Sequence, residues 1–267
     1  MEQPYRAAPD IVVLPSFVFV PGFGIVPANA FLIEAAEPVL VDTGVTAESD
    51  QFMATLRSLI DLKQLRWIWL THTDPDHIGS LRRVLAEAPF ARLITTFVGL
   101  GKLTLFGGLQ LDRVYLLNPG QSLNVGDRRL TTFKPPVFDA PETTGLFDDK
   151  ADALFTADCF GAVVRELRQD AAEIPSEDLN RDQTLWATVD APWIHCAEPS
   201  ALARALDSVR RMAPDVILSS HLPPARALTE AFIQNLTQAR TATPFVGPDQ
   251  AAFEAAMALT EVGTEAP

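Results

Sequence analysis

Residues 71–79 read Thr-His-Thr-Asp-Pro-Asp-His-Ile-Gly and hold two histidines and two aspartates within six positions. They follow the apolar run at residues 67–70, which predicts a buried strand that ends in ionisable side chains. His72 and Asp74 lie two residues apart and therefore point to the same side of an extended segment. Because burying an unpaired charge is costly, the pattern predicts a metal site at the rim of a sheet. The alternative is a polar strand-to-helix loop in which an aspartate caps the helix.

Several other short apolar runs along the chain also end in a carboxylate or an imidazole. A single such case carries little information, because aspartate readily caps helices and turns. Strand ends on one edge of a sheet converge in space, however, so residues far apart in the sequence can form one site. The strand-end positions are Asp42, His72 with its neighbours, Asp139, Asp158 and His221.

Apolar periodicity predicts the elements that must position these side chains. Strands are expected at residues 11–20, 31–33, 39–41, 67–70, 92–97, 129–133, 153–156 and 216–218. Helices are expected around residues 52–60, 78–85 and 202–212, the last ended by Pro214, and in the tail at about 229–267. The alternation of strands and helices predicts one α/β domain over residues 1–267, with the C-terminal helices packed on it.

The amino-acid composition excludes several classes of protein. With 48% hydrophobic residues the 267-residue chain can bury a sizeable core, and no apolar run is long enough to span a bilayer. The N-terminus lacks a charged region followed by an apolar stretch, so we expect a soluble, cytoplasmic protein without a targeting signal. Acidic residues outnumber basic ones by 34 to 21, which argues against nucleic acid as a partner. Two cysteines are too few for a disulfide framework and favour reduced thiols.

The order and spacing of these motifs resemble the metallo-β-lactamase superfamily. That superfamily has a first pair of strands ending in an Asp-Thr-Gly-like turn, then Thr-His-x-His-x-Asp-His-x-Gly, then three later ligands. This chain has Asp-Thr-Gly at residues 42–44 and the longer motif at residues 71–79, and the likeness extends over about residues 31–224. The resemblance implies a four-layer αβ/βα sandwich of the metallo-β-lactamase type.

Within the superfamily, the chain is most similar to the flavodiiron branch. Asp74 stands where the superfamily has its second motif histidine, and a carboxylate there, normally glutamate, is typical of this branch. Residues 118–126 resemble the strand-turn before the third ligand, and residues 154–161 closely resemble the segment with the bridging aspartate. Asp139, in Asp-Ala-Pro-Glu, stands where the branch has a histidine followed by x-Pro-Asp/Glu. Residues 219–221 match the segment with the final histidine.

The resemblance implies two metal ions that share seven ligands. These are His72, Asp74 and Asp139 for the first ion, Asp76, His77 and His221 for the second, and Asp158 as the bridge. His77 is either a ligand or a group that supports one. Asp76 and Asp158 are the implied catalytic residues. Two departures from the branch affect the first ion, because Asp74 is shorter than glutamate and Asp139 replaces a histidine.

Four aspartates at this centre carry enough negative charge to neutralise two divalent cations. Oxygen-rich ligation favours iron or manganese over zinc, which prefers imidazole and thiolate. The same neutralisation makes a ferrous pair easy to oxidise and leaves a bound water less acidic, which favours oxygen chemistry over hydrolysis. We therefore expect two divalent metal ions, with iron favoured and manganese or zinc as the other options.

By resemblance, the protein is expected to bind or reduce a diatomic ligand such as dioxygen or nitric oxide, as a metal-dependent oxidoreductase. The chain ends at Pro267 without a flavin-carrying domain, so turnover is expected to need electrons from an external redox partner. Without such a partner, the protein would be an oxygen-binding or sensing module rather than an enzyme. Homodimers are common in this branch, and neither a membrane nor a nucleic acid is expected as a partner.

Two other functions stay open. The first is a hydrolase of an ester, thioester or lactone, in which Asp76 orients a metal-bound hydroxide; the chain lacks the histidine-rich ligand set and the His-x-Pro-Gly-His type segment common in such enzymes. The second is a metal-poor family member with a binding role. Bound iron with an absorbance change in oxygen would support the oxidoreductase, and zinc with ester turnover would support the hydrolase.

Four further features have structural interpretations. His195 is expected to make a structural hydrogen bond rather than to take part in catalysis. Cys159 is expected to be a packed thiol, and Asp42 is expected to brace the loops of the site rather than bind metal. The polar stretch at residues 165–181 is expected to be a solvated helix and loop rather than a lid.

Overall fold

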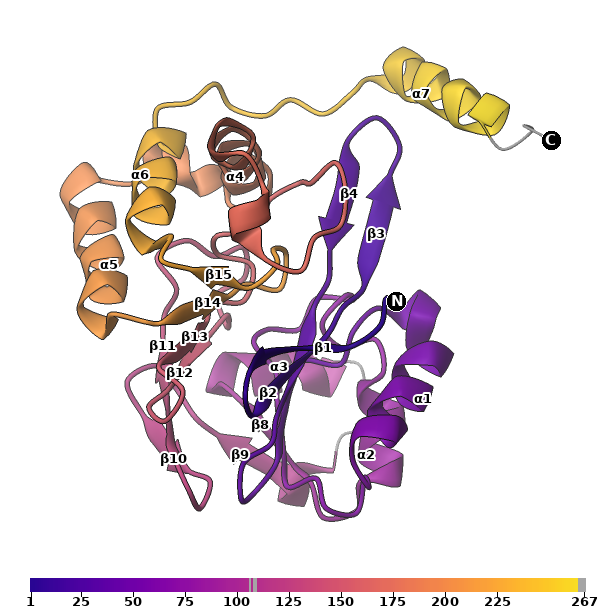
Figure 1. Cartoon of the computed structure of the whole chain (residues 1–267), viewed down its shortest axis with the longest axis vertical. Helices are drawn as coiled ribbons and strands as arrows, with labels where there is room; N and C mark the ends of the chain where they lie inside the picture. Colours follow the sequence, from indigo (N-terminus) through magenta and orange to yellow (C-terminus); the bar gives the residue numbers. More distant parts are fainter. Residues whose placement is uncertain (106, 108–109, 264–267) are drawn as a thin grey trace.

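In a computed structural model of the chain, residues 1–105, 107 and 110–263 are described. Their secondary structure forms four layers in the order helices, sheet, sheet, helices (Figure 1). One group of helices covers the outer face of a seven-stranded sheet, and another covers the outer face of a six-stranded sheet. This arrangement confirms the predicted four-layer αβ/βα fold.

The seven-stranded sheet is antiparallel in its first half and parallel in its second. Its strand order is β1-β2-β5-β6-β7-β8-β9, and the last four strands run in the same direction. The strands are β1 (Tyr5–Ala8), β2 (Ile11–Leu14), β5 (Ala30–Ile33), β6 (Val39–Val41), β7 (Trp67–Trp69), β8 (Arg92–Thr95) and β9 (Val114–Leu116). Because parallel strands end at one edge of a sheet, the residues after β6 and β7 lie close together.

The six-stranded sheet brings three more strand ends to one edge. Its strand order is β10-β11-β12-β13-β14-β15, in which β13 and β14 are parallel. Because β11 and β13 are both antiparallel to β12, they also run in the same direction. The strands are β10 (Ser122–Asn124), β11 (Arg129–Phe133), β12 (Gly145–Asp148), β13 (Ala153–Phe155), β14 (Val216–Leu218) and β15 (Ala225–Arg226). The residues after β11, β13 and β14 therefore share an edge.

The helices present apolar stripes to the two sheets. Helices α1 (Ser49–Leu59), α2 (Leu81–Glu87) and α3 (Phe97–Leu105) lie on the first sheet, and α4 (Ser176–Asp190), α5 (Pro199–Met212) and α6 (Thr229–Ala239) lie on the second. In α5 the buried residues Leu202, Leu206 and Val209 recur at the spacing of one helix face. The side chain of Glu198 caps the first turn of α5 by accepting two backbone N–H bonds.

The core has three parts, one between each pair of neighbouring layers. Between the two sheets, the rings of Phe31 and Phe155 meet edge to face with 5.3 Å between their centroids. Leu56 of α1 packs on the first sheet, and Phe232 of α6 packs on the second. Each fully buried side chain of this size stabilises the fold by about 1.5–3 kcal/mol. The strand ends that carry ionisable residues are therefore held by a rigid interior.

The main differences from the expected elements occur where strands break. The expected strand at residues 11–20 is two strands, because Pro15 cannot donate to a ladder. After β2, strand β3 (Phe17–Val20) leaves the large sheet and pairs with β4 (Gly24–Pro27) in a separate hairpin. The expected strand at residues 92–97 ends at Thr95, and α3 follows. Periodicity does not predict β1, β9 or β12, because strands of three or four residues are too short for a pattern, and it does not predict α3 either.

The two C-terminal helices differ in how they pack. Helix α6 buries Phe232 and Leu236 in the outer core, as expected of a helix that packs on the domain. Helix α7 (Gln250–Gly263) follows an extended segment and lies beside the tip of the β3–β4 hairpin (Figure 1). Its described side chains are mostly exposed, in contrast to the expected packing. Residues 264–267 of the expected helical range lie outside the described residues.

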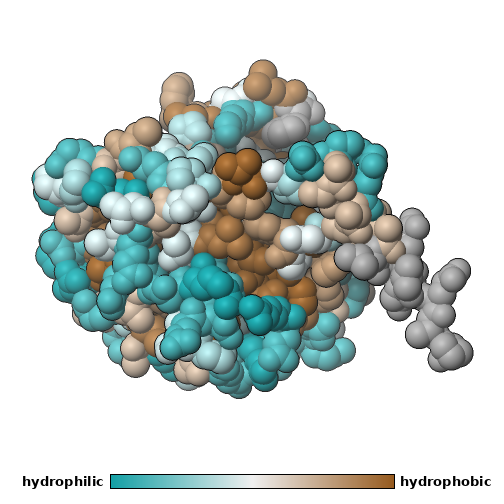
Figure 2. Space-filling view, turned by 90° about the horizontal axis from the view of Figure 1, so that it is seen from above, coloured by the Kyte–Doolittle hydropathy of each residue, from teal (hydrophilic) through white to brown (hydrophobic). Residues whose placement is uncertain are grey.

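Exposed apolar side chains gather on the hairpin and on the segment that leads to α7. They include Phe19, which is 54% exposed, and Val246, which is 85% exposed. Figure 2 shows apolar residues on the face seen from the top of Figure 1, where these segments lie. None of the helices in the described part of the chain is both long and apolar enough to cross a membrane.

Candidate metal centre

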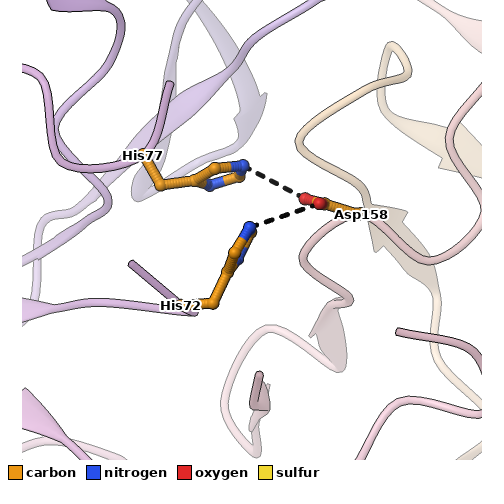
Figure 3. A group of neighbouring side chains, drawn as sticks. All are labelled: His72, His77 and Asp158. Carbon is orange, nitrogen blue, oxygen red and sulfur yellow. Dashed lines mark ion pairs between the residues drawn. The ribbon is translucent and has the colours of Figure 1, made fainter. Parts of the chain in front are cut away.

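Three imidazoles converge on the carboxylate of Asp158. The Nε2 atoms of His77 and His221 each lie 3.1 Å from its Oδ1 atom. Nε2 of His72 lies 3.3 Å from Oδ2. Figure 3 shows His72 and His77 approaching Asp158 from the opposite side of the centre. All four residues are at most 4% exposed, so the cluster lies in the protein interior.

Each residue of this cluster follows the carboxyl end of a strand. His72 and His77 follow β7, Asp158 follows β13, and His221 follows β14. Asp139 lies in the connection between β11 and β12. The structure therefore brings together strand ends from both sheets, as the sequence predicts, because these ends point to the same edge of the sandwich.

Two glycines permit close approaches of the chain at this edge. A Cβ atom on Gly79, the last residue of the histidine-rich motif, would lie 2.3 Å from the backbone nitrogen of Thr46. A Cβ atom on Gly161 would lie 2.6 Å from Nε1 of Trp186 and 2.7 Å from Cβ of His221. A larger residue at either position would push apart segments that carry site residues.

Three residues without glycine's freedom adopt a left-handed backbone beside the cluster. Their φ angles are 60° for Asp42, 52° for Ala157 and 67° for Phe160. Such conformations cost about 1–3 kcal/mol each and persist where the surrounding structure demands them. One of these residues is Asp42 itself, and the other two lie in the turn that carries Asp158.

Asp42 positions the imidazole of His77. Its Oδ2 atom lies 2.9 Å from Nδ1 of His77 and accepts a hydrogen bond of 2.7 Å from Oγ1 of Thr71. Its Oδ1 atom accepts the backbone N–H of Thr71 at 2.8 Å. These contacts are those of the predicted bracing residue, because they tie the end of β6 to the motif after β7.

In the other two imidazoles, Nδ1 also contacts a residue on the side away from the centre. Nδ1 of His221 lies 2.5 Å from the carbonyl oxygen of Pro27, and Nδ1 of His72 lies 3.1 Å from Oγ1 of Thr71. A partner at Nδ1 fixes the orientation of an imidazole and directs Nε2 toward a metal. All three Nε2 atoms therefore face the same space.

Carboxylates extend the cluster on either side of Asp158. Four groups of side chains have ligand atoms within 4.8 Å of one another: His72–His77–Asp158, Asp76–His77–His221, His72–Asp74–Asp139 and Asp139–Asp158–Asp190. The structure thus brings together all seven residues predicted as metal ligands, and it adds Asp190. Their role as ligands remains a prediction.

The buried atoms that face the centre lack hydrogen-bond partners. Among the described residues, these atoms include Nε2 of His72, Nε2 of His77 and Oδ1 of Asp158. Burying such a group unsatisfied costs about 1–3 kcal/mol. A cation placed among these atoms would satisfy them together, and a set of nitrogen and oxygen donors suits a divalent transition metal. The residues present therefore fit a metal ion.

The centre attracts positive charge. Burial disfavours protonation of His221, but the Asp158 carboxylate outweighs burial and raises the pKa of this histidine to about 9. Against the same effect of burial, Asp158 and Asp42 also raise the pKa of His77. In return, and despite its burial, the imidazoles hold the pKa of Asp158 well below its usual value. Because metal ions and protons compete for the same lone pairs, a bound metal would take the place of protons here.

Two residues of α4 border the centre although no sequence motif identifies them. Trp186 donates Nε1–H to the backbone oxygen of Asp158 at 3.0 Å, and its ring centroid lies 4.5 Å from that of His221. Asp190, one turn later, joins the carboxylate group of Asp139 and Asp158. The only available signal is the four-residue spacing of Trp186 and Asp190, which places both on one helix face.

The remaining sequence-based interpretations concern residues around the centre. Nδ1 of His195 lies 3.2 Å from the carbonyl oxygen of Arg240, which is a structural contact as predicted. Cys159 is buried in the outer core, and burial raises the pKa of its thiol, which confirms a packed thiol. Residues 165–181 are mostly exposed, apart from buried Ala171 and Leu179, as expected of a solvated segment.

Comparison with known sequences gives one family and several relatives. A family model described as "ODP family beta lactamase" matches residues 26–221. The type A flavoprotein of Rhodobacter capsulatus is 32% identical over 137 residues, which cover 50% of this chain and 32% of that protein. The putative diflavin flavoprotein A 2 of a Nostoc strain is 31% identical over 136 residues, which cover 50% of this chain and 23% of the relative. The matched segment is thus a third or less of each relative's length.

Comparison with solved structures shows a shared fold. The rubredoxin oxygen:oxidoreductase of Desulfovibrio gigas has a TM-score of 0.79 at 17% identity, covering 91% of this chain and 63% of that one. The flavodiiron protein of Giardia intestinalis has a TM-score of 0.79 at 17% identity, covering 90% of this chain and 60% of that one. A Nostoc diflavin flavoprotein fragment has a TM-score of 0.74 at 18% identity, covering 90% of this chain and 96% of that one.

Proposed function

The chain belongs to the ODP family of β-lactamases, in line with the predicted superfamily and branch, and on that premise we propose that it is a di-iron protein. In this proposal it binds or reduces a diatomic ligand such as dioxygen or nitric oxide. The observation that carries the proposal is the convergence of three buried imidazoles on Asp158, with carboxylates on both sides.

The chain's residues divide into two metal positions. The first position has His72, Asp74 and Asp139, and the second has Asp76, His77 and His221, with Asp158 between them. When bound, a pair of ferrous ions would supply two electrons to a diatomic ligand. The protein's own contribution is to orient the imidazoles, neutralise the metal charge and keep bulk water away. Buried Asp42 and Thr71 serve the first of these tasks.

The ligand set supports iron, with manganese as the closest alternative. Oxygen donors from Asp74, Asp76, Asp139 and Asp158 outnumber the imidazole nitrogens, and the described cysteines lie outside the groups with metal-ligand spacing. Hard oxygen donors suit iron and manganese better than zinc. The carboxylate charge also favours the higher oxidation state, as required of a site that gives electrons to a ligand.

A cleft beside the centre gives a ligand room to approach it. The cleft has a volume of about 750 Å³ and reaches Asp74 and Thr73. Its lining combines apolar side chains, among them Leu81, Leu85 and Leu103, with the basic residues Arg82, Arg83 and Lys102.

Turnover requires an electron donor outside the residues that form this centre. The names of two relatives refer to flavins, and the name of the Desulfovibrio gigas protein refers to rubredoxin and oxygen. In our proposal, a separate redox protein donates electrons to this chain, and a chain without such a donor acts as a ligand-binding or sensing module.

Anaerobic loading with ferrous iron tests the proposal. The wild-type protein should take up two iron ions per chain and change its absorbance when it meets dioxygen or nitric oxide. His72→Ala should lose iron and the absorbance change, because it removes a central ligand. His195→Ala is the matched control, since this histidine contacts the Arg240 carbonyl and should leave both unchanged. Zinc uptake with ester turnover would contradict the proposal in favour of a hydrolase, and no metal uptake would favour a metal-poor binding protein.

A further inference from the structure

Asp190, the last residue of α4, is a fourth carboxylate beside the first metal position, which already has Asp74, Asp139 and Asp158. One oxygen each from Asp139, Asp158 and Asp190 lie within 4.8 Å of one another. Asp139 and Asp158 come from loops at the ends of strands, whereas Asp190 comes from a helix that covers the outer face of the second sheet. The motif resemblance assigns no role to Asp190.

Contacts along one face of α4 fix the position of Asp190. Gln183 donates Nε2–H to the backbone oxygen of Phe160 at 2.8 Å, and Trp186 donates to the backbone oxygen of Asp158 at 3.0 Å. Positions 183, 186 and 190 recur at the spacing of one helix face. Asn235 of α6 holds Gln183 in turn, through a hydrogen bond of 2.7 Å. The helix is thus attached to the turn that carries Asp158, and its last turn reaches the centre.

Among the described residues, no lysine or arginine forms an ion pair with Asp190. No hydrogen bond or ion pair from this part of the chain reaches its side chain, and the last turn of α4 contains no basic residue. A carboxylate at the C-terminal end of a helix is also disfavoured by the helix dipole. Asp190 also lies among like-charged groups, because ligand atoms of Asp139 and Asp158 are within 4.8 Å of its carboxylate. A cation between the carboxylates would remove this unfavourable arrangement.

Unpartnered atoms on the neighbouring residues point to the same ligand. Oδ1 of Asp158 and Nε2 of His72 are buried without a hydrogen-bond partner among the described residues. Both residues are at least nine-tenths buried; Nε2 of His72 lies 3.9 Å from Oδ2 of Asp139, and Asp158 belongs to one group of carboxylates with Asp139 and Asp190. The carboxylate cluster therefore adjoins a set of atoms that needs a metal ion.

We infer that Asp190 is an additional ligand of the metal ion at the first position, where it joins Asp139 and Asp158. The inference rests on the proposed metal centre. It gives the first position a surplus of carboxylates, with His72 as its imidazole, while the second position keeps His77 and His221. The two positions therefore differ in chemistry, and the first should prefer a hard ion such as Mn²⁺ or Fe²⁺ more strongly than the second.

Titration of the metal-free protein with Mn²⁺ tests the assignment of Asp190. Electron paramagnetic resonance distinguishes one isolated Mn²⁺ from a coupled pair, and isothermal titration gives the affinity of each ion. The wild type should show a coupled pair after it binds two ions. In Asp190→Asn, one ion should bind as before and the other about tenfold or more weakly, so that the isolated-ion spectrum persists. Asp190→Glu should recover part of the affinity, because it restores the carboxylate.

The matched control is Asp178→Asn in the first turn of the same helix. Asp178 pairs with Arg181 on the surface, and its replacement should leave both affinities unchanged. Folding of every variant is checked by circular dichroism and by the midpoint of thermal unfolding without metal. Asp190→Asn removes a carboxylate from a like-charged cluster, so the metal-free variant should be at least as stable as the wild type.

The outcomes separate the inference from the proposed function. If the wild type binds two ions and Asp190→Asn binds them equally well, the role of Asp190 is wrong and the dinuclear centre stands. If the wild type binds a single ion, the dinuclear proposal is wrong. The Asp190 assignment is then supported by a tenfold loss of affinity for that ion in Asp190→Asn, and overturned by an unchanged affinity. A wild type that binds no Mn²⁺ and no Fe²⁺ overturns both.

Discussion

Two clusters of acidic residues in this protein are neutralised in different ways. In the first, Arg128 pairs with Asp10, Asp127 and Asp148, and Lys150 also contacts Asp127. Nη1 of Arg128 lies 2.9 Å from Oδ2 of Asp148, and both side chains are fully buried. A permanent cation is part of this cluster, so its carboxylates are partnered within the protein.

The second cluster is the candidate metal centre. Among the described residues, Asp139, Asp158 and Asp190 have no ion pair with lysine or arginine, and the groups that face Asp158 are imidazoles. An imidazole can lose its proton so that the ring nitrogen binds a metal ion, whereas a guanidinium keeps its charge at every physiological pH.

The difference shows what each cluster is suited to do. Hydrogen bonds from Arg128 are the main cause of the lowered pKa of Asp127, whereas burial and a neighbouring carboxylate raise the pKa of Asp190 to about 8. The Arg128 cluster is complete in the protein alone and joins residues 10, 127 and 148 structurally. The second cluster has no lysine or arginine partner among the described residues, which agrees with the proposed metal centre.

The largest change in stability is expected from replacing Arg128, the permanent cation of the first cluster. Arg128→Met leaves Asp148 buried and unpaired, which should lower the free energy of unfolding by about 3–5 kcal/mol. Urea denaturation measures this change. The metal content per folded chain should stay at the wild-type value. Arg129→Met is the control, because this neighbour is 64% exposed in its pair with Asp149, and an equal loss in both variants would contradict the assigned role of Arg128.

Binding of metal at the second cluster should raise the free energy of unfolding of the protein by a comparable amount. At free metal about 100 times the dissociation constant, the free energy of unfolding should rise by about 2.7 kcal/mol. Asp158→Asn should lose most of this gain, because Asp158 faces all three imidazoles. Denaturation with and without metal measures the difference. An equal gain in the variant would mean that the metal binds elsewhere.

A smaller effect is expected from the residue that orients an imidazole. Asp42→Asn should weaken metal binding about 10–100-fold, or about 1.4–2.7 kcal/mol, because His77 loses its charged partner at Nδ1. Isothermal titration of the metal-free protein measures the affinity. Asp61→Asn at an exposed position serves as the control. If Asp42→Asn bound metal like the wild type, Asp42 would brace only the loops.

The smallest effect is expected on the pH dependence of stability. The folded state lowers the pKa of Asp127, so this carboxylate contributes stability above its unfolded pKa of about 3.9 and loses it as pH falls toward the folded value. Because Asp127 lies near the surface, the contribution should be below about 1 kcal/mol. Denaturation between pH 7 and acid should show a steeper loss for the wild type than for Asp127→Asn. Parallel curves would show that Arg128 interacts only weakly with Asp127.

Local patterns predict most of the centre, because its residues lie directly after strands. The motif at residues 71–79 places His72 and His77 beside β7 whatever the rest of the chain does, since the strand is specified by its own apolar residues. Asp158 and His221 are predictable for the same reason. Pro15, by contrast, ends β2 and sends the next strand into a hairpin, and the periodicity of residues 11–20 does not reveal where the chain goes.

The sequence by itself determined the kinds of candidate ligand, their order and the edge of the sandwich at which they meet, because each of these residues directly follows a strand that its own apolar residues specify. Only the tertiary structure decided which ring nitrogens face the centre, since His221 is oriented by the carbonyl of Pro27, 194 residues away. It also decided that Asp190 belongs to the centre. The rotation and position of α4 depend on contacts with the Asp158 turn and with α6, and no residue of α4 specifies them alone.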